Sequence, residues 1–171
     1  MATRLLEPDP TLLGLLGALY PTVRWEVVEL FEGLPATVRR FTSGAITLPH
    51  PLSTHRLRIY FADGQWRPCT HAGIGLIVHE AFHILQFQER LGGVGLGPLR
   101  GFALQYLARA AFEGGGERNA YEAPAYAHER AFVAACRELP RPLCAGGRID
   151  LAMQLELLRR YPSLVRISTD G

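Results

Sequence analysis

The stretch Leu76-Ile-Val-His79-Glu80-Ala-Phe-His83-Ile-Leu-Gln86 is the part of the sequence around which the rest is organised. Its apolar surroundings, and the absence of Gly and Pro from Leu76 to Leu91, predict one buried helix. Four residues advance a helix by about 400° and roughly 6 Å, so His79 and His83 lie on one face with converging imidazoles. Two neutral imidazoles in this arrangement can share one tetrahedral Zn²⁺.

Glu80 completes the pattern H-E-x-x-H. It is turned about 100° from His79, which places it beside a metal rather than on it. There it can act as the general base that takes a proton from a zinc-bound water. The alternative is a buried helix whose histidines only bond to backbone groups. Burying three such polar side chains without partners is costly, so the pattern favours a zinc cofactor.

Length and composition are those of one ordinary globular domain spanning residues 1–171. The hydrophobic share is 48% and the charged share 20%, which excludes a disordered or fibrous chain. All 18 basic residues are Arg, and they are scattered along the chain. No basic stripe therefore indicates nucleic acid or an anionic membrane. The lack of Lys excludes a P-loop and Schiff-base chemistry.

Cysteine usage and the N-terminus both bear on location. Three cysteines, at spacings that match no zinc knuckle, are expected to be reduced thiols in a cytosolic protein. The apolar run from Leu12 to Leu19 follows acidic rather than basic residues and lacks a cleavage site, so we do not expect a signal peptide. It is also too short to span a bilayer. A cytoplasmic protein is expected.

The elements around the motif predict an α+β fold. An N-terminal helix is expected at 12–20, capped by Thr11, and Thr70 is expected to cap the motif helix. Strands are expected at 23–31, 44–48 and 57–61, and further helices at 99–113, 119–139 and 150–160, the last capped by Asp150. The glycine-rich segment 92–98 does not follow a strand, so a dinucleotide site is rejected.

A catalytic zinc needs a third protein ligand and one open position. The metzincin extension requires Gly and His where this chain has Gln86 and Glu89, so that class is excluded. Carboxylates on a later helix remain. Glu122, Tyr126 and Glu129 are spaced i, i+4 and i+7, which places two carboxylates and a phenol on one helical face.

This combination resembles the gluzincins, which pair H-E-x-x-H on one helix with a Glu on a second, and among them the small bacterial minigluzincins. The chain most resembles an uncharacterised bacterial group akin to the metallopeptidase-like core domain of extracellular contractile injection systems. That group has a Gln after H-E-x-x-H and then an Asn-Pro-Tyr-Glu-x-Glu-Ala-Tyr-like stretch. The matching residues, within about residues 55–135, are His79, Glu80, His83, Gln86, Asn119, Tyr121, Glu122, Ala125 and Tyr126.

The resemblance implies a zincin-like fold of an N-terminal helix, a three-stranded sheet, the motif helix, a glutamate helix and a C-terminal helix. It also implies a peptidase acting on peptides or proteins, with His79, His83 and Glu122 as zinc ligands and Glu80 as base. The chain departs from the group at Ala120 and Pro124, where Pro and Glu are usual, which leaves Glu129 open as third ligand. Asn119 and Glu122 also match a capping box, a purely structural role.

Other nearby residues have two readings each. Tyr126 can donate a hydrogen bond to a developing oxyanion or simply fill the core. Gln86 can orient a ligand or lie exposed. His71 and Cys69 can supply a fourth ligand, which would make the zinc structural. His128 is expected at the surface.

The leading function is a zinc-dependent metallohydrolase, most plausibly a peptidase, with the strand at 57–61 offering an edge to an extended peptide. The alternatives are a non-catalytic metal-stabilised domain for binding or assembly, and a metal-free helical scaffold. A structural zinc has no use for Glu80 and takes four protein ligands, so the enzyme is preferred. The sequence does not indicate an oligomeric state.

Overall fold

The computed structural model describes residues 3–39, 42, 44–50, 56–90 and 119–166. These residues form a mixed α+β fold with four α-helices: α1 (Pro10–Leu19), α2 (His71–Arg90), α4 (Glu122–Arg137) and α5 (Leu151–Arg160). Short 3₁₀ turns lie at Trp25–Val27 and Pro162–Leu164. The helix expected at 99–113 and the glycine-rich segments at 92–98 and 114–116 lie outside the described residues.

The main sheet has four strands, in the order β1 (Arg4–Leu5), β2 (Val28–Glu32), β4 (Leu57–Phe61) and β3 (Ala45–Pro49). β2 and β4 are parallel, whereas β1 and β3 run antiparallel to their neighbours. Three strands were expected, and β1 is the addition. β4 lies in the middle of the sheet, so the expectation that it offers a free edge is wrong. Among the described strands, β1 and β3 form the two edges of the sheet.

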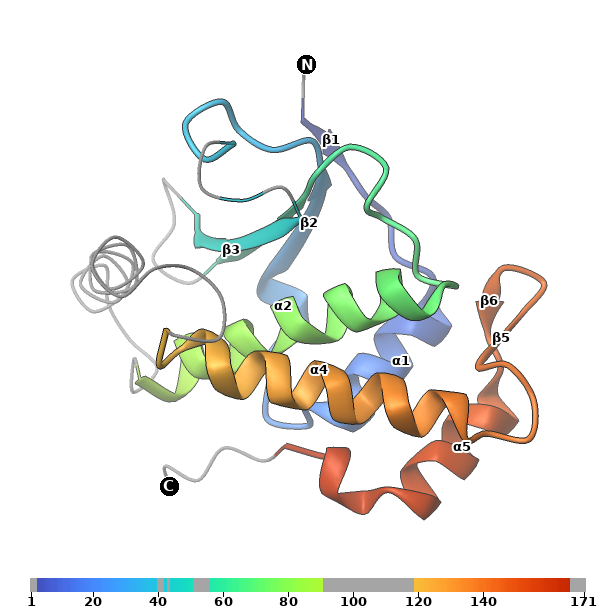
Figure 1. The fold of residues 1–171 in the computed structure, drawn as a ribbon. Helices are drawn as coiled ribbons and strands as arrows, with labels where there is room; N and C mark the ends of the chain where they lie inside the picture. The colour runs from blue at the N-terminus through green and yellow to red at the C-terminus, as the bar shows by residue number, and fades with distance from the viewer. Residues whose placement is uncertain (1–2, 40–41, 43, 51–55, 91–118, 167–171) are drawn as a thin grey trace.

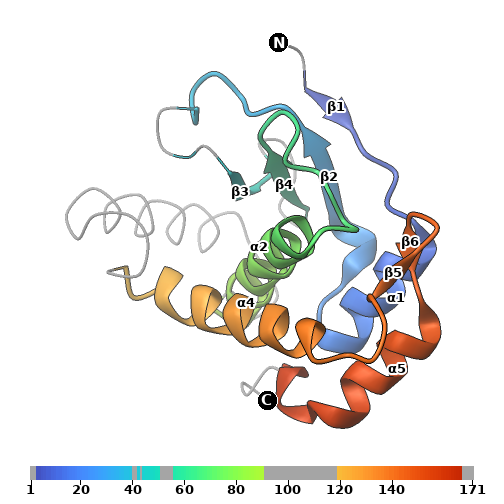
Figure 2. The same ribbon diagram turned by 45° about the vertical axis from the view of Figure 1, so that its right-hand side comes forward.

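The core lies between the sheet and the helices. Strand alternation turns Leu30, Ile59 and Phe61 toward the helices, where they join the buried leucines of α1. The other sheet face carries a smaller cluster, in which Ile46 and Tyr60 pack. Figures 1 and 2 show α2 lying between the sheet and α4. The motif helix is therefore the central element of the fold, as its apolar sequence predicts.

α2 and α4 run antiparallel, side by side along most of their length (Figures 1 and 2). Gly75 permits this close approach. A Cβ atom at this position would lie 2.8 Å from Val133 Cγ2 and 3.3 Å from Glu129 Oε1. Because only glycine leaves this space, the acidic face of α4 can lie directly against the histidine face of α2.

Two of the three expected helix caps are confirmed. Thr70 Oγ1 accepts a hydrogen bond from a first-turn backbone N–H of α2 at 3.0 Å, and Asp150 does the same for α5 at 3.1 Å. The cap expected at Thr11 is wrong, because Asp9 caps α1 instead. Pro10 is the reason: its ring favours the first helical position, where no N–H is needed, so the helix begins earlier than expected.

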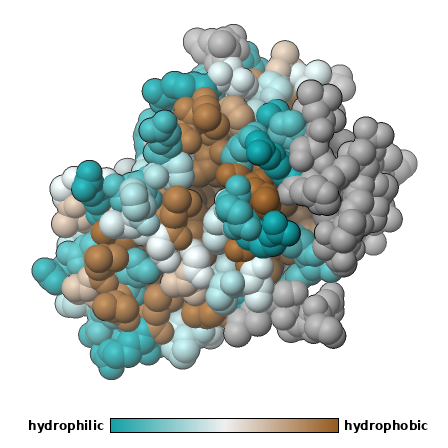
Figure 3. Space-filling view, turned by 180° about the vertical axis from the view of Figure 1, so that it is seen from behind, coloured by the Kyte–Doolittle hydropathy of each residue, from teal (hydrophilic) through white to brown (hydrophobic). Residues whose placement is uncertain are grey.

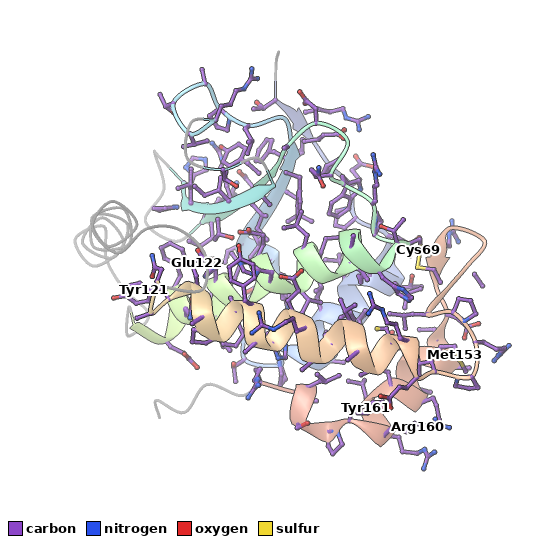
Figure 4. The ribbon with its side chains drawn as sticks, in the orientation of Figure 1. Cys69, Tyr121, Glu122, Met153, Arg160 and Tyr161 are labelled. Atoms are coloured by element: carbon purple, nitrogen blue, oxygen red, sulfur yellow. A yellow bond between two sulfur atoms is a disulfide. The ribbon has the colours of Figure 1, made fainter. Side chains whose placement is uncertain are left out.

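Cys69 and Cys144 form a disulfide, with their Cα atoms 5.5 Å apart, so the expectation of reduced thiols is wrong for these two residues. The bond joins the segment before α2 to a two-stranded hairpin, β5 (Cys144–Ala145) and β6 (Arg148–Ile149), as Figure 4 shows. A separation of 75 residues conceals this pairing in the sequence. Cys136 is free and buried. The expected cytoplasmic location loses the support of reduced cysteines.

Within the described part of the chain, no helix combines the length and apolar character needed to cross a membrane. Apolar side chains do reach the surface at a few places. The back view of Figure 3 shows brown patches separated by polar residues. Among the residues that the structure describes, the large exposed apolar side chains are Leu5, Leu13, Leu151 and Leu155.

Candidate metal centre

Three side chains from two helices converge in the interior. His79 and His83 come from α2. Glu122, labelled in Figure 4, comes from the first turn of α4. His79 Nε2 lies 3.2 Å from His83 Nε2 and 3.1 Å from Glu122 Oε2. His83 Nε2 lies 3.4 Å from Glu122 Oε1. All three residues are buried. They are the three that the family resemblance implies as ligands.

These spacings suit a metal ion. Ligand atoms bound tetrahedrally at 2.0–2.2 Å lie about 3.3–3.6 Å from one another, close to the separations of the two imidazoles and the carboxylate. Only small shifts of the side chains are needed to admit an ion. The group formed by His79, His83 and Glu122 can therefore hold a metal.

The start of α4 explains how Glu122 reaches the site. The Asn119 side-chain oxygen accepts a hydrogen bond from the Tyr121 N–H at 2.9 Å, and the Glu122 N–H donates to the Asn119 carbonyl at 3.0 Å. The helix thus begins at Glu122, later than expected. Pro124 then falls in the first turn, where a helix has no use for its missing N–H. Pro124, which stands where the related group usually has Glu, therefore does not prevent Glu122 from lying at the metal centre.

Glu129 lies behind His79 rather than among the converging groups. Its Oε2 is 3.1 Å from His79 Nδ1. When Nδ1 donates its proton to this carboxylate, the lone pair of Nε2 faces the other two ligands. Glu129 is therefore placed to orient His79, whereas the sequence had left it open only as a third metal ligand.

Gln86 orients the imidazole of His83, as Glu129 orients that of His79. Its side-chain oxygen lies 2.8 Å from His83 Nδ1, and its amide donates to the Tyr121 carbonyl at 3.0 Å. Of the two readings of Gln86, the structure supports the orienting one. The amide also ties the last turns of α2 to the start of α4, next to Glu122.

The electrostatics of the site favour a cation. Burial lowers the pKa of His79, but hydrogen bonds to Glu122 and Glu129 and the charges of Glu80 and Glu122 outweigh burial and raise it to about 10. Three carboxylates thus surround two imidazoles in a largely buried space. Such an excess of buried negative charge is costly unless a proton or a metal cation balances it.

Glu80 is buried beside the metal-binding group without being part of it. Burial raises the pKa of its carboxyl group. Thr47 Oγ1, on β3, donates a hydrogen bond to Glu80 Oε2 at 2.7 Å. Sequence reasoning did not single out Thr47. The only available signal was its position in a short strand, where alternation places it on the face that packs against the motif helix.

The remaining candidate residues from the sequence differ in whether they lie next to the metal-binding group. The Tyr126 ring packs edge-on against His79, with ring centroids 4.5 Å apart, so it borders the site. His71 is exposed at the first residue of α2, and Cys69 is in the disulfide, so neither joins the group. His128 is buried, and its Nδ1 accepts a hydrogen bond from Arg166 at 3.3 Å, so the surface expectation is wrong.

The arrangement predicts a graded effect on metal affinity. We expect Glu129→Gln to weaken zinc binding about 10–100-fold, the usual cost of losing a group that orients a ligand. Glu122→Gln should cost more, because it removes a charged ligand. Competition with a chromophoric chelator measures both, with Glu138→Gln at the far end of α4 as control. Wild-type affinity in Glu129→Gln would contradict the orienting role.

Comparisons of the chain with protein-family models, with curated proteins and with solved structures found no match.

Proposed function

We propose that this protein is a zinc-dependent metallohydrolase of the gluzincin type, acting as a peptidase. The observation that carries the proposal is the buried group of His79, His83 and Glu122 with Glu80 held next to it. Two imidazoles and one carboxylate form the ligand set that catalytic zinc uses in this class of enzyme. They also leave a fourth position for water or substrate.

Each residue has a defined task in such a reaction. When bound, zinc lowers the pKa of water and polarises a carbonyl oxygen. The Glu80 carboxylate takes the proton from the attacking water and then delivers it to the leaving amine. Tyr126 borders His79 and is proposed to donate a hydrogen bond to the developing oxyanion.

The substrate is proposed to be an extended peptide that adds to β3. β3 is one of the two edge strands of the sheet, and among the described strands it pairs with β4 alone. Thr47 on β3 contacts Glu80, so a peptide lying along this edge passes close to the metal-binding group. Backbone hydrogen bonds to an edge strand give affinity for peptides of varied sequence.

A non-catalytic, metal-stabilised binding or assembly domain is the alternative, and the site chemistry favours it less. Structural zinc sites use four protein ligands, whereas the described residues offer three at this position. Cys69, one candidate for the fourth, is engaged in the disulfide. A structural zinc also gives no role to the buried Glu80.

We place the peptidase in an oxidising compartment rather than in the cytoplasm. The Cys69 side of the disulfide is exposed, and exposed disulfides are reduced in most cytosols. The disulfide therefore favours a protein that works outside the reducing environment expected from the cysteine count.

Metal-dependent proteolysis tests the proposal. Purified protein loaded with zinc is expected to cleave an unstructured substrate such as casein, and mass spectrometry would show the new termini. Removal of the metal with a chelator should abolish cleavage, and added zinc should restore it. A parallel preparation of His79→Ala controls for contaminating proteases. Cleavage that persists in the metal-free protein or in His79→Ala would refute the proposal.

A further inference from the structure

We propose that Thr47 is a positioning residue that links the peptide-binding edge of the sheet to the general base. This inference deepens the proposed function and rests on it. The Thr47 hydroxyl lies 2.7 Å from Glu80 Oε2 and 3.3 Å from the Glu80 carbonyl. Through this hydroxyl, β3 contacts the carboxylate that is proposed to act as the base.

The hydrogen bond is built into the interior of the protein. Thr47 is 6% exposed and Glu80 is 4% exposed, so bulk water does not readily replace either partner. A buried hydrogen bond to a charged group is short and strong. Among the described residues, Thr47 is the one donor to Glu80 Oε2, and Oε1 accepts no hydrogen bond from them. One oxygen is thus held, and the other is left for the proton of the attacking water.

Strand register shows where the backbone of Thr47 points. At one end of the β3–β4 pairing, the Ala62 N–H donates to the Gly44 carbonyl at 2.7 Å. At the other end, the His50 N–H donates to the Arg56 carbonyl at 2.9 Å. In antiparallel strands, such bonded positions alternate with positions whose backbone groups point away from the partner. Thr47 is three residues from both Gly44 and His50, so its N–H and C=O point away from β4, toward the edge that no described strand covers.

Thr47 therefore has two roles in the proposed site, one through its side chain and one through its backbone. The side chain of Thr47 holds the base, and its backbone groups are placed to pair with a peptide that adds to β3. A peptide bound in this way would extend the sheet at the strand whose hydroxyl holds Glu80.

Two substitutions separate the hydroxyl from the rest of the side chain. Thr47→Val keeps the shape and the strand propensity but removes the donor. Thr47→Ser keeps the donor. We expect Thr47→Val to lower kcat roughly 10–100-fold, the usual effect of misplacing a catalytic group. KM should stay within about twofold, because the backbone that pairs with the peptide is unchanged. Thr47→Ser should recover most of the lost turnover.

A crystal structure of Thr47→Val supplies a readout that needs no activity. The Glu80 carboxylate is expected to rotate away from its wild-type position, while the two histidines and Glu122 stay in place. Zinc content and circular dichroism establish that the variant is folded and loaded. If KM rises and kcat does not fall, or if the carboxylate stays in place, the proposal is wrong.

The same experiments distinguish this inference from the function on which it rests. If wild-type protein shows no Glu80-dependent cleavage, the peptidase proposal fails. The position of the Glu80 carboxylate in Thr47→Val then decides the positioning role alone, since displacement supports it and retention overturns it.

Discussion

Glu80→Gln is expected to lower the turnover of a peptide substrate at least a hundredfold, while zinc content and melting temperature change little. General-base catalysis contributes about 10²–10⁴-fold, and Gln cannot accept the proton from water. Gln is close in size to Glu, and its amide oxygen can still accept the Thr47 hydrogen bond. Initial rates of cleavage, with zinc measured by mass spectrometry in the same samples, give the comparison.

The control for this experiment is Glu26→Gln, a change of the same chemistry at an exposed position outside the site. It should leave turnover unchanged. Cleavage at the wild-type rate in Glu80→Gln would rule out the mechanism. Among the described residues, the other carboxylates near the site, Glu122 and Glu129, are already engaged with His79.

Loss of the disulfide is expected to have the largest effect on stability. The bond closes a loop of 75 residues, and in the chain-entropy model such a cross-link contributes about 4.5 kcal/mol. The double variant Cys69→Ser/Cys144→Ser should therefore melt roughly 10 °C below the wild type. Reducing agent should lower the wild-type melting temperature to that of the variant and leave the variant unaffected.

Thiol counting provides the matching chemical test. Denatured wild-type protein should show one reactive thiol, that of Cys136, and all three of its cysteines only after reduction. Three reactive thiols without reduction would show that the disulfide does not form. That result would again favour the cytoplasmic location that the sequence led us to expect.

Local sequence patterns predicted much of the fold. The apolar run around H-E-x-x-H predicts α2, and the alternation of Leu57, Ile59 and Phe61 predicts β4, because each pattern depends on neighbouring residues. Pairings between distant segments were not predictable in this way. β1 has two residues and acquires its structure only by pairing with β2, and Cys69 meets Cys144 only in the folded chain.

The candidate site likewise combines features that local sequence predicts with features that depend on contacts between distant segments. Helical spacing placed His79 and His83 together, since both belong to one helix. Family resemblance was needed to favour Glu122, because Glu129 lies on the same face of α4. The distinction between them depends on the angle at which α4 crosses α2, which the close contact at Gly75 helps to determine. Thr47 was missed because its role depends on which strand forms the edge.

The metal centre is tested most directly by a crystal structure with an anomalous difference map recorded at the zinc edge. We predict one peak that lies about 2.0–2.2 Å from His79 Nε2, His83 Nε2 and a Glu122 oxygen, with Glu129 and Gln86 on the far sides of the two imidazoles. A zinc-loaded crystal with no peak between these three residues, or with its peak at another site, would contradict the prediction.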